Sequence, residues 1–178
     1  MSFKPARLDI DSYVMLLACI ARLRSEDPYL KVGAVALSED NRVIGTAYNG
    51  LAPGVNKPPS FWADRAARLP FLIHAEINLC SLFERGAAHT VAATTMPCPS
   101  CAAVLIAHKV KRVLWGSRYH RDAGNQSEML FEDAGITLFH VPVDRVAGQL
   151  YACCFEPAVM TKRSWAWATM QVLRKILS

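Results

Sequence analysis

The second half of the sequence alternates between strand-like and helix-like segments, and this order constrains the fold more than any other feature. Small and β-branched residues in TVAATT, and apolar runs in VKRVLWG and ITLFHV, are typical of strands. The segments between them carry apolar residues at helical spacing. Such alternation predicts a sheet that contains parallel strands and is covered by helices on both faces. The predicted strands are residues 90–95, 110–116 and 136–141, and the predicted helices are residues 99–109 and 125–135.

The first half begins with a helix followed by a hairpin. Asp11 or Ser12 can cap a helix whose apolar stripe continues until RSEDP ends it. The segments VGAVAL and RVIGTAY flank the polar turn SEDN and predict two antiparallel strands. Because Gly33 and Gly45 stand inside these strands, we expect another part of the chain to approach them closely.

A long loop and a further helix are predicted next. Residues 49–70 hold four prolines and two glycines, which is too many for a regular element, so at most one helical turn is expected, around WADRAAR. Loops of this length are usually functional. Residues 71–86 then predict a helix that Gly86 ends. The side chains expected to be buried on it are Ile73, Ile77, Cys80 and Leu82 or Phe83.

Together these elements predict a three-layer α/β/α domain around a mixed sheet of about five strands. The length of 178 residues suits one domain, with a core at residues 12–140 and an extra C-terminal helical extension at residues 144–178. The extension would dock onto the sheet or onto a second subunit. Its apolar stripe would consist of Trp165, Thr169, Val172 or Leu173, and Ile176.

Composition excludes several classes of protein. Hydrophobic residues make up 52% of the chain and charged residues 20%, which argues against disorder. No apolar stretch reaches the roughly 20 residues of a membrane-spanning helix, so we expect no membrane partner. Asp9, Asp11 and Arg22 interrupt any signal-peptide pattern at the start, and the six cysteines show no framework of a secreted protein. We therefore expect a cytoplasmic protein.

The formal charge of +5 favours anionic partners but does not choose between nucleotides, nucleic acid and acidic proteins. The basic residues collect in HKVKRV, in SRYHR and near the C-terminus. A nucleic-acid-binding protein would usually show a longer basic stripe interleaved with exposed aromatic residues. The clusters are therefore interpreted as solvated surface, and nucleic acid is not expected as a partner.

Cys98 and Cys101 form the pair of residues with the most reactive chemistry. They lie three positions apart, where the first turn of a helix would follow a strand, and so share one face. Pro97 and Pro99 suit such a helix start, because proline is tolerated at the first turn. Taken alone, the pair fits a redox site, a structural zinc site or part of a catalytic zinc site equally well.

His74 and Glu76 favour the catalytic zinc site. A catalytic zinc typically has three protein ligands, and His74 could join Cys98 and Cys101 if the two helix starts meet at one end of the sheet. No fourth cysteine or histidine lies near either motif in sequence, apart from Cys80, His89 and His108, which lie late in or beyond their predicted helices. This leaves a coordination position for water. Zinc lowers the pKa of water to roughly 7, and Glu76 could take and return the proton.

These motifs resemble a known family. HAE followed by PCPSC matches the signature of the zinc-dependent nucleobase deaminases. Within that superfamily, residues 12–140 look like a deoxycytidylate (dCMP) deaminase of the cytidine-deaminase-like fold. Four further stretches carry this resemblance, namely RSEDPYLKVGAVAL, TAYNGLAPG, GSRYH and MLFEDAGITL.

The resemblance implies one catalytic Zn²⁺ on His74, Cys98 and Cys101, and a role for Glu76 in moving protons as dCMP becomes dUMP and ammonia for thymidylate synthesis. It also implies a homo-oligomer, either a hexamer or an assembly built on dimers. Regulation by deoxynucleoside triphosphates is implied as well, with Mg²⁺ accompanying such an effector. The implied substrate contacts are Asn49, Tyr119, Ala75, Arg24 and Ser25.

Other interpretations of these residues remain open. Asn49 could occupy a left-handed turn before Gly50, and Tyr119 could be a core or interface residue. Arg24 and Ser25 could cap a helix. The loop after Asn49 departs from the family pattern, which leaves regulation open. The alternative functions are deamination of dCTP or of modified dCMP, deamination of adenosine in tRNA, and nucleotide sensing by a catalytically silent fold.

Overall fold

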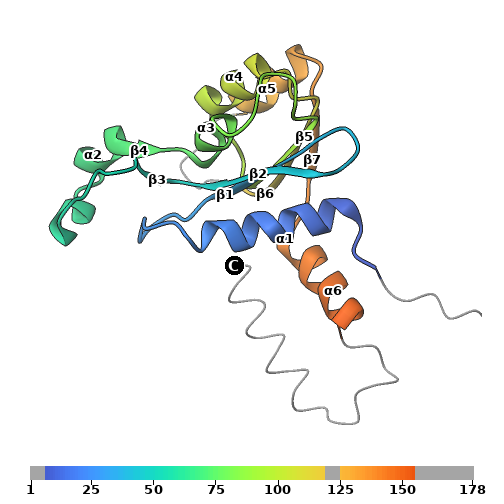
Figure 1. Cartoon of the computed structure of the whole chain (residues 1–178), viewed down its shortest axis with the longest axis horizontal. Helices are drawn as coiled ribbons and strands as arrows, with labels where there is room; N and C mark the ends of the chain where they lie inside the picture. The colour runs from blue at the N-terminus through green and yellow to red at the C-terminus, as the bar shows by residue number, and fades with distance from the viewer. Residues whose placement is uncertain (1–6, 119–124, 155–178) are drawn as a thin grey trace, which may run out of the picture.

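A five-stranded mixed sheet separates two layers of helices in the computed structural model, which describes residues 7–118 and 125–154 (Figure 1). The strand order is β2-β1-β5-β6-β7. Strand β1 pairs antiparallel with β2 and with β5, whereas β5, β6 and β7 are parallel. The strands are β1 (Gly33–Leu37), β2 (Val43–Tyr48), β5 (Thr90–Thr95), β6 (Arg112–Ser117) and β7 (Thr137–His140).

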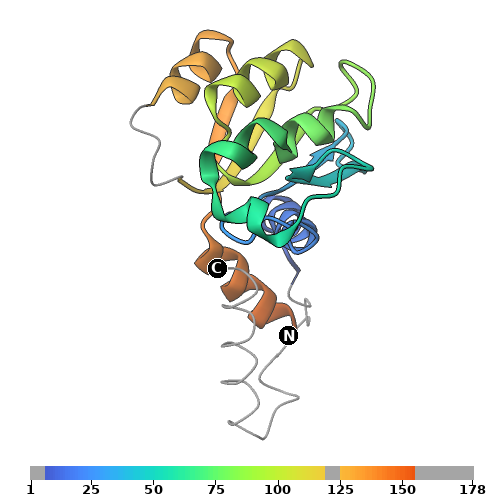
Figure 2. The same ribbon diagram turned by 90° about the vertical axis from the view of Figure 1, so that its left-hand side faces the viewer.

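Within the described residues, three helices cover one face of this sheet and two cover the other. Figure 2 shows the two layers. The first group consists of α3 (Ala75–Cys80), α4 (Pro99–Ala107) and α5 (Gln126–Asp133). The second consists of α1 (Ile10–Arg22) and α6 (Val143–Cys154). The predicted three-layer α/β/α fold with an extra C-terminal helix is therefore confirmed.

The central strands bury both of their faces, which explains why they consist of small, apolar and β-branched residues. Every residue of β1 and β5 is buried. Successive side chains of a strand point to opposite faces, so Ala34 and Ala36 join the core beneath α3 and α4, while Val35 and Leu37 join the core beneath α1. Gly33 is needed for the packing of α1, because a Cβ atom there would lie 2.0 Å from the backbone oxygen of Ala18.

The first helix starts earlier than the sequence suggested, so the prediction of Asp11 or Ser12 as its cap was wrong. Asp9 is the N-cap, and its Oδ1 accepts a hydrogen bond of 2.8 Å from the Ser12 N–H. Asp11 instead pairs with Arg112 of β6 through contacts of 2.7 and 2.6 Å. The apolar stripe of α1 begins after Asp9, so the hydrophobic pattern does not indicate which polar residue caps the helix.

The predicted helix at residues 71–86 is shorter than expected. Helix α3 starts only after His74, because β4 (Leu72–Ile73) pairs with β3 (Gly50–Leu51) in a small second sheet. The helix ends at Cys80, which is buried as predicted, but Ile77 and Leu82 are 39% and 55% exposed. The expectation for Ile77 was therefore wrong, because the buried face of α3 is formed by Ala75, Glu76, Leu79 and Cys80. Of the alternatives Leu82 and Phe83, it is Phe83 that packs, partly buried, against the core.

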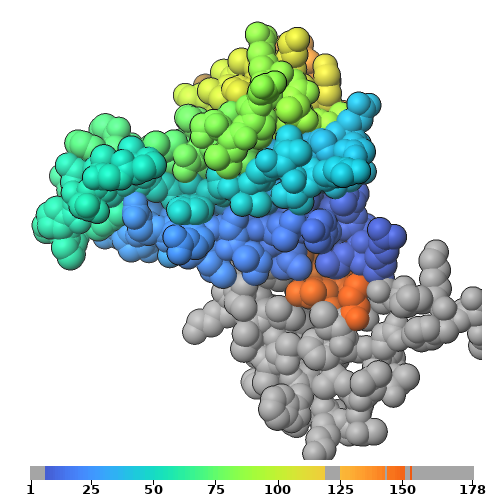
Figure 3. Space-filling model, in the orientation of Figure 1, coloured from blue at the N-terminus to red at the C-terminus, as the bar shows by residue number. Residues whose placement is uncertain are grey.

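The predicted loop forms an appendage that projects from the main body (Figure 3). It holds more helical structure than the single turn expected, because Asp64 accepts hydrogen bonds from Ala66 and Ala67 and caps a turn there. The short helices are η1 (Pro59–Ala63), α2 (Arg65–Arg68) and η2 (Leu69–Phe71).

Helix α6 is the extra helix that was predicted at the C-terminal end of the domain. The rest of the predicted extension lies outside the described residues, and so do Trp165, Thr169, Val172, Leu173 and Ile176. The boundaries of the core and the extension stay a prediction. Among residues 7–118 and 125–154, no helix has the length and apolar character needed to cross a membrane.

Candidate metal centre

Helices α3 and α4 begin beside each other at one edge of the sheet. Strands β2 and β5 both run antiparallel to β1, so they share a direction and their carboxyl ends meet at the same edge. The chain enters α3 after β2 and the β3–β4 excursion, and it enters α4 directly after β5. His74 and Cys98 are the N-cap residues of these helices, both with extended backbone. The expected convergence of the two helix starts is thus observed, although α3 does not directly follow a strand of the main sheet.

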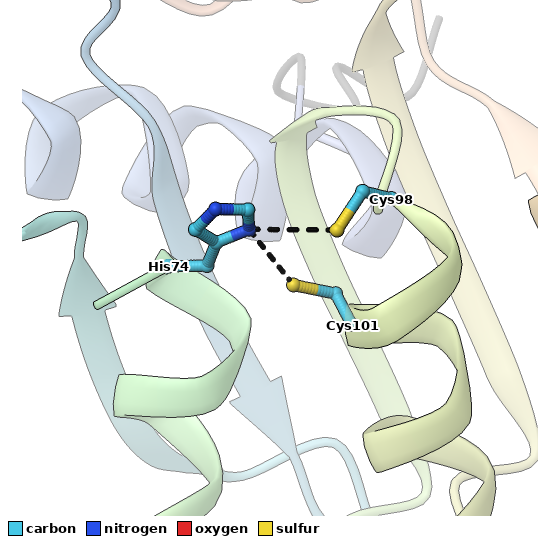
Figure 4. Close-up of side chains that lie close together, drawn as sticks. All are labelled: His74, Cys98 and Cys101. Carbon is cyan, nitrogen blue, oxygen red and sulfur yellow. Dashed lines mark hydrogen bonds between the residues drawn. The ribbon is translucent and has the colours of Figure 1, made fainter. Parts of the chain in front are cut away.

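The three predicted metal ligands meet at this edge (Figure 4). Nδ1 of His74 lies 3.2 Å from Sγ of Cys101 and 3.5 Å from Sγ of Cys98. The three ligand atoms all lie within 4.8 Å of one another. Zinc bonds of about 2.1 Å to nitrogen and 2.3 Å to sulfur place neighbouring ligands of a tetrahedral site about 3.6 Å apart. The spacing and the donor types therefore fit zinc.

The three metal-binding side chains differ in their exposure to solvent. Cys101 is fully buried, Cys98 is half-buried and His74 is exposed. Pro99 lies in the first turn of α4, where its missing N–H leaves no unmet hydrogen bond, and Cys101 follows it one turn from Cys98. The site is therefore exposed to solvent on the side of His74.

The side chains perturb one another strongly. A hydrogen bond from the Cys101 side chain lowers the pKa of Cys98 to about 4, against the opposing effect of burial and with the help of His74. The hydrogen bond between His74 and Cys98 raises the pKa of the His74 imidazole. The pKa of Cys101 is raised, chiefly by its side-chain interaction with Cys98 and also by its burial. One thiolate is thus already favoured, and a bound cation would stabilise the second.

Glu76 lies in the first turn of α3 and is buried, with 4% of its surface exposed. Its Oε2 accepts a hydrogen bond from Sγ of Cys101 at 3.4 Å. Burial raises the pKa of the Glu76 carboxyl, which favours its protonated form. A carboxyl group that can hold a proton therefore adjoins three metal-binding side chains, as hydrolytic proton transfer requires.

Comparison with known proteins identifies the family. Residues 8–117 match the family described as the cytidine and deoxycytidylate deaminase zinc-binding region. The deoxycytidylate deaminases of Pongo abelii and Homo sapiens are each 31% identical to this chain over 141 residues, which cover 73% of this chain and 78% of the relative. The chain belongs to the cytidine and deoxycytidylate deaminase family. The family predicted from the HAE and PCPSC motifs is therefore confirmed, and with it the zinc cofactor.

A solved structure supports the fold assignment. The crystal structure of the dCMP deaminase from the cyanophage S-TIM5 in apo form superposes with a TM-score of 0.61 at 18% identity. The similarity covers 76% of this chain and 99% of the cyanophage chain. This chain and the cyanophage enzyme thus share the three-layer fold.

Asn49 lies between β2 and β3 of the deaminase fold and is buried. Its Oδ1 accepts a hydrogen bond of 2.7 Å from the Val32 N–H, and its Nδ2 donates one of 2.9 Å to the Leu30 oxygen. Asn49 does not have the positive φ that a left-handed turn would require. Its side chain thus braces the segment before β1, and its predicted contact with the substrate stays a prediction.

Of the other predicted substrate contacts, Ala75, Arg24 and Ser25 lie within the described residues. Ala75 is buried directly after His74. Ser25 is buried, and its Oγ accepts a hydrogen bond of 3.3 Å from the Asp27 N–H, whereas Arg24 is exposed and lies over the ring of Tyr48 at 5.9 Å. Tyr119 lies outside the described residues. The roles predicted for these residues remain to be tested.

Asn78 is a site residue that the sequence reasoning missed. It lies on α3, where its N–H bonds to the backbone oxygen of His74 at 2.9 Å, and its Nδ2 donates a hydrogen bond of 3.0 Å to the oxygen of Tyr48. Asn78 therefore ties the turn that carries His74 and Glu76 to the end of β2. Its polar side chain one helical turn after His74 was the only sequence signal.

Proposed function

We propose that the protein hydrolyses dCMP to dUMP and ammonia at a single zinc ion held by His74, Cys98 and Cys101. The observation that carries this proposal is the meeting of one imidazole and two thiols beside the buried carboxyl group of Glu76. The relatives that share about a third of the sequence are named deoxycytidylate deaminases, which supports dCMP as the substrate.

The reaction replaces the exocyclic amino group of cytosine by oxygen. Water supplies the oxygen that bonds to C4, the C4–N bond breaks, and ammonia leaves. A zinc ion in the site would supply a Lewis acid that makes this water acidic near neutral pH. The raised pKa of Glu76 suits it to deliver a proton to the ring nitrogen N3 and to pass the proton of the water to the departing amine.

The substrate contacts proposed here follow the family resemblance. Asn49 would contact the sugar and Ala75 the base. Arg24 and Ser25, on the loop before β1, would meet the phosphate, and Tyr119 would pack against the nucleotide. These contacts are consistent with the positive charge of the chain, because an anionic substrate is attracted by it.

The biological setting is also part of the proposal. We place the enzyme in the cytoplasm, as a homo-oligomer that supplies dUMP for thymidylate synthesis. A deoxynucleoside triphosphate, accompanied by Mg²⁺, would regulate it. Gel filtration combined with light scattering tests the assembly, and addition of dCTP or dTTP to the assay tests the regulation.

A substrate panel tests the proposed reaction. Zinc-loaded protein is incubated separately with dCMP, dCTP, 5-methyl-dCMP, deoxycytidine, cytidine and an adenosine-containing tRNA stem-loop, and ammonia release is followed. Fastest turnover of dCMP supports the proposal. Preference for any other substrate overturns the dCMP assignment, and equal ammonia release by a Glu76→Gln variant overturns the proposed role of this site.

A further inference from the structure

Glu26 reaches from the loop after α1 to the small sheet that precedes the metal centre. Its Oε1 accepts a hydrogen bond of 2.8 Å from the backbone N–H of Leu51, 25 residues further along the chain. Leu51 is the second residue of β3. A carboxylate that accepts from a backbone N–H makes a stronger hydrogen bond than a neutral acceptor does. Glu26 thus fixes a strand that contains only two residues.

Strand β3 pairs with β4, the strand that leads directly to a predicted metal ligand. Leu51 pairs with Leu72, and Gly50 pairs with Ile73. The residue after Ile73 is His74, whose Nδ1 faces both sulfurs. A two-residue ladder is marginally stable alone, so its position depends on what holds its outer strand. Glu26 is connected to His74 through this ladder and one peptide bond.

The loop that carries Glu26 is itself firmly held. We define the α1–β1 loop as residues 23–32. Asp27, which is buried, accepts hydrogen bonds from the N–H groups of Tyr29 at 2.8 Å and Leu30 at 3.2 Å. Nζ of Lys31 donates to the oxygen of Ser25 at 2.5 Å. Glu26 is therefore presented from a fixed backbone.

Gly50 gives Glu26 the room it needs. A Cβ atom at Gly50 would lie 3.3 Å from Oε1 of Glu26, which is tighter than ordinary van der Waals contact. A larger residue at this position would require the carboxylate of Glu26 to shift by a few tenths of an ångström. The absence of a side chain at Gly50 thus allows Glu26 of the α1–β1 loop to approach β3 closely.

We propose that Glu26 is a positioning residue for the metal centre, which it serves by holding β3, and through it β4 and His74. The inference rests on the proposed function in taking zinc as the metal. The α1–β1 loop also carries Arg24 and Ser25, the proposed phosphate contacts. One loop therefore sets the position of the metal ligand and of the residues that would meet the substrate phosphate.

The first test measures the hold on the small sheet without reference to the metal. Amide hydrogen exchange is followed in peptides that cover residues 50–52 and 71–74, in metal-free and zinc-loaded protein. Glu26→Ala removes the acceptor and raises exchange about five-fold, whereas Glu26→Gln keeps an acceptor and stays within about two-fold of the wild type. Glu39→Ala is the matched control, because Glu39 is an exposed glutamate in the turn between β1 and β2. Unchanged exchange in Glu26→Ala overturns the proposal.

The second test measures the metal. Zinc release to a chelator quickens about five-fold in Glu26→Ala, while Glu26→Gln and Glu39→Ala release zinc at about the wild-type rate. The Co²⁺-substituted Glu26→Ala protein also shows a changed absorption spectrum, which a loss of general stability would not produce. Equal zinc release by Glu26→Ala and Glu26→Gln overturns the positioning role. A wild-type protein that binds no zinc overturns the proposed function instead, and exchange in the metal-free protein still decides whether Glu26 holds β3.

Discussion

Nδ1 of His74 lies 3.2 Å from Sγ of Cys101, although 27 residues separate them in the chain. The contact exists because two helices start at the same edge of the sheet, each with a ligand at its N-cap. Its geometry matches a zinc site and leaves one side open. The fold thereby brings two short motifs together in one centre that can hold a metal.

Loss of one thiol should empty this centre. In Cys101→Ser we expect zinc to fall from about one ion per chain to below about 0.2 after dialysis, and kcat/KM to fall at least about 10³-fold, because a serine hydroxyl is a poor zinc ligand. Metal analysis and an ammonia assay measure the two effects. Cys153→Ser, on α6, is the control and should keep both. Full zinc occupancy in Cys101→Ser would contradict the ligand assignment.

Glu76→Gln should separate metal binding from proton transfer. The amide keeps the size of the buried side chain but cannot take and return a proton, so kcat should fall about 10² to 10⁴-fold while zinc content and KM change little. Steady-state kinetics and metal analysis check this. Glu84→Gln, an exposed glutamate after α3, should behave as the wild type. A variant that keeps wild-type kcat would show that Glu76 moves no proton in the reaction.

The main sheet could be predicted from the sequence because its strands and helices depend on local patterns. A buried strand such as β1 has a continuous apolar sequence, and the alternation of strands with helices indicates the layers. The start of α3 could not be predicted in this way. Residues Leu72 and Ile73 suit either a helix or a strand, and pairing with β3 decides between them across more than twenty residues of chain.

The residues of the candidate site also differ in whether the sequence alone could predict their roles. His74, Cys98 and Cys101 could be predicted from the sequence because few other residue types bind zinc, and the structure brings them together. The roles of Arg24 and Tyr119 stay predictions. Glu26 carried no signal, because its partner is a backbone N–H, which nearly every residue offers. Side chains that act on the backbone are recognised only when the fold places the two segments together.

Two glycines provide a matched test of packing. Gly33→Ala should destabilise the protein by about 2 to 4 kcal/mol, because the new methyl group would overlap the oxygen of Ala18 and push α1 from the sheet. Gly148→Ala, on α6 with no atom within 4 Å of its added Cβ, should stabilise it by about 0.5 to 1 kcal/mol. Urea unfolding at saturating zinc measures both. A Gly33→Ala loss below about 0.5 kcal/mol would show that α1 shifts at little cost.

The contact between α1 and α6 should make stability depend on pH in the acid range. Asp9 caps α1 and also accepts hydrogen bonds from Arg145, at 2.8 Å, and from Gln149 of α6. Burial opposes ionisation of Asp9, but the hydrogen bonds from Arg145, the Ser12 N–H and Gln149 outweigh it and lower its pKa. Because the folded pKa is depressed, the stabilisation is fully present above the unfolded value of about 3.9 and is lost as the pH falls below it.

Asp9→Asn isolates this effect. Asparagine can still cap the helix, but it cannot pair with Arg145, so the variant should unfold at lower urea than the wild type at pH 7, and the difference should shrink as the pH falls from about 5 to 3. Metal-free protein is used throughout, because the zinc ligands also gain protons in this range. Asp133→Asn, exposed at the end of α5, is the control and should differ from the wild type by a constant amount. A gap between Asp9→Asn and the wild type that stays constant down to pH 3 would mean that the charge of Asp9 does not hold α6 against α1.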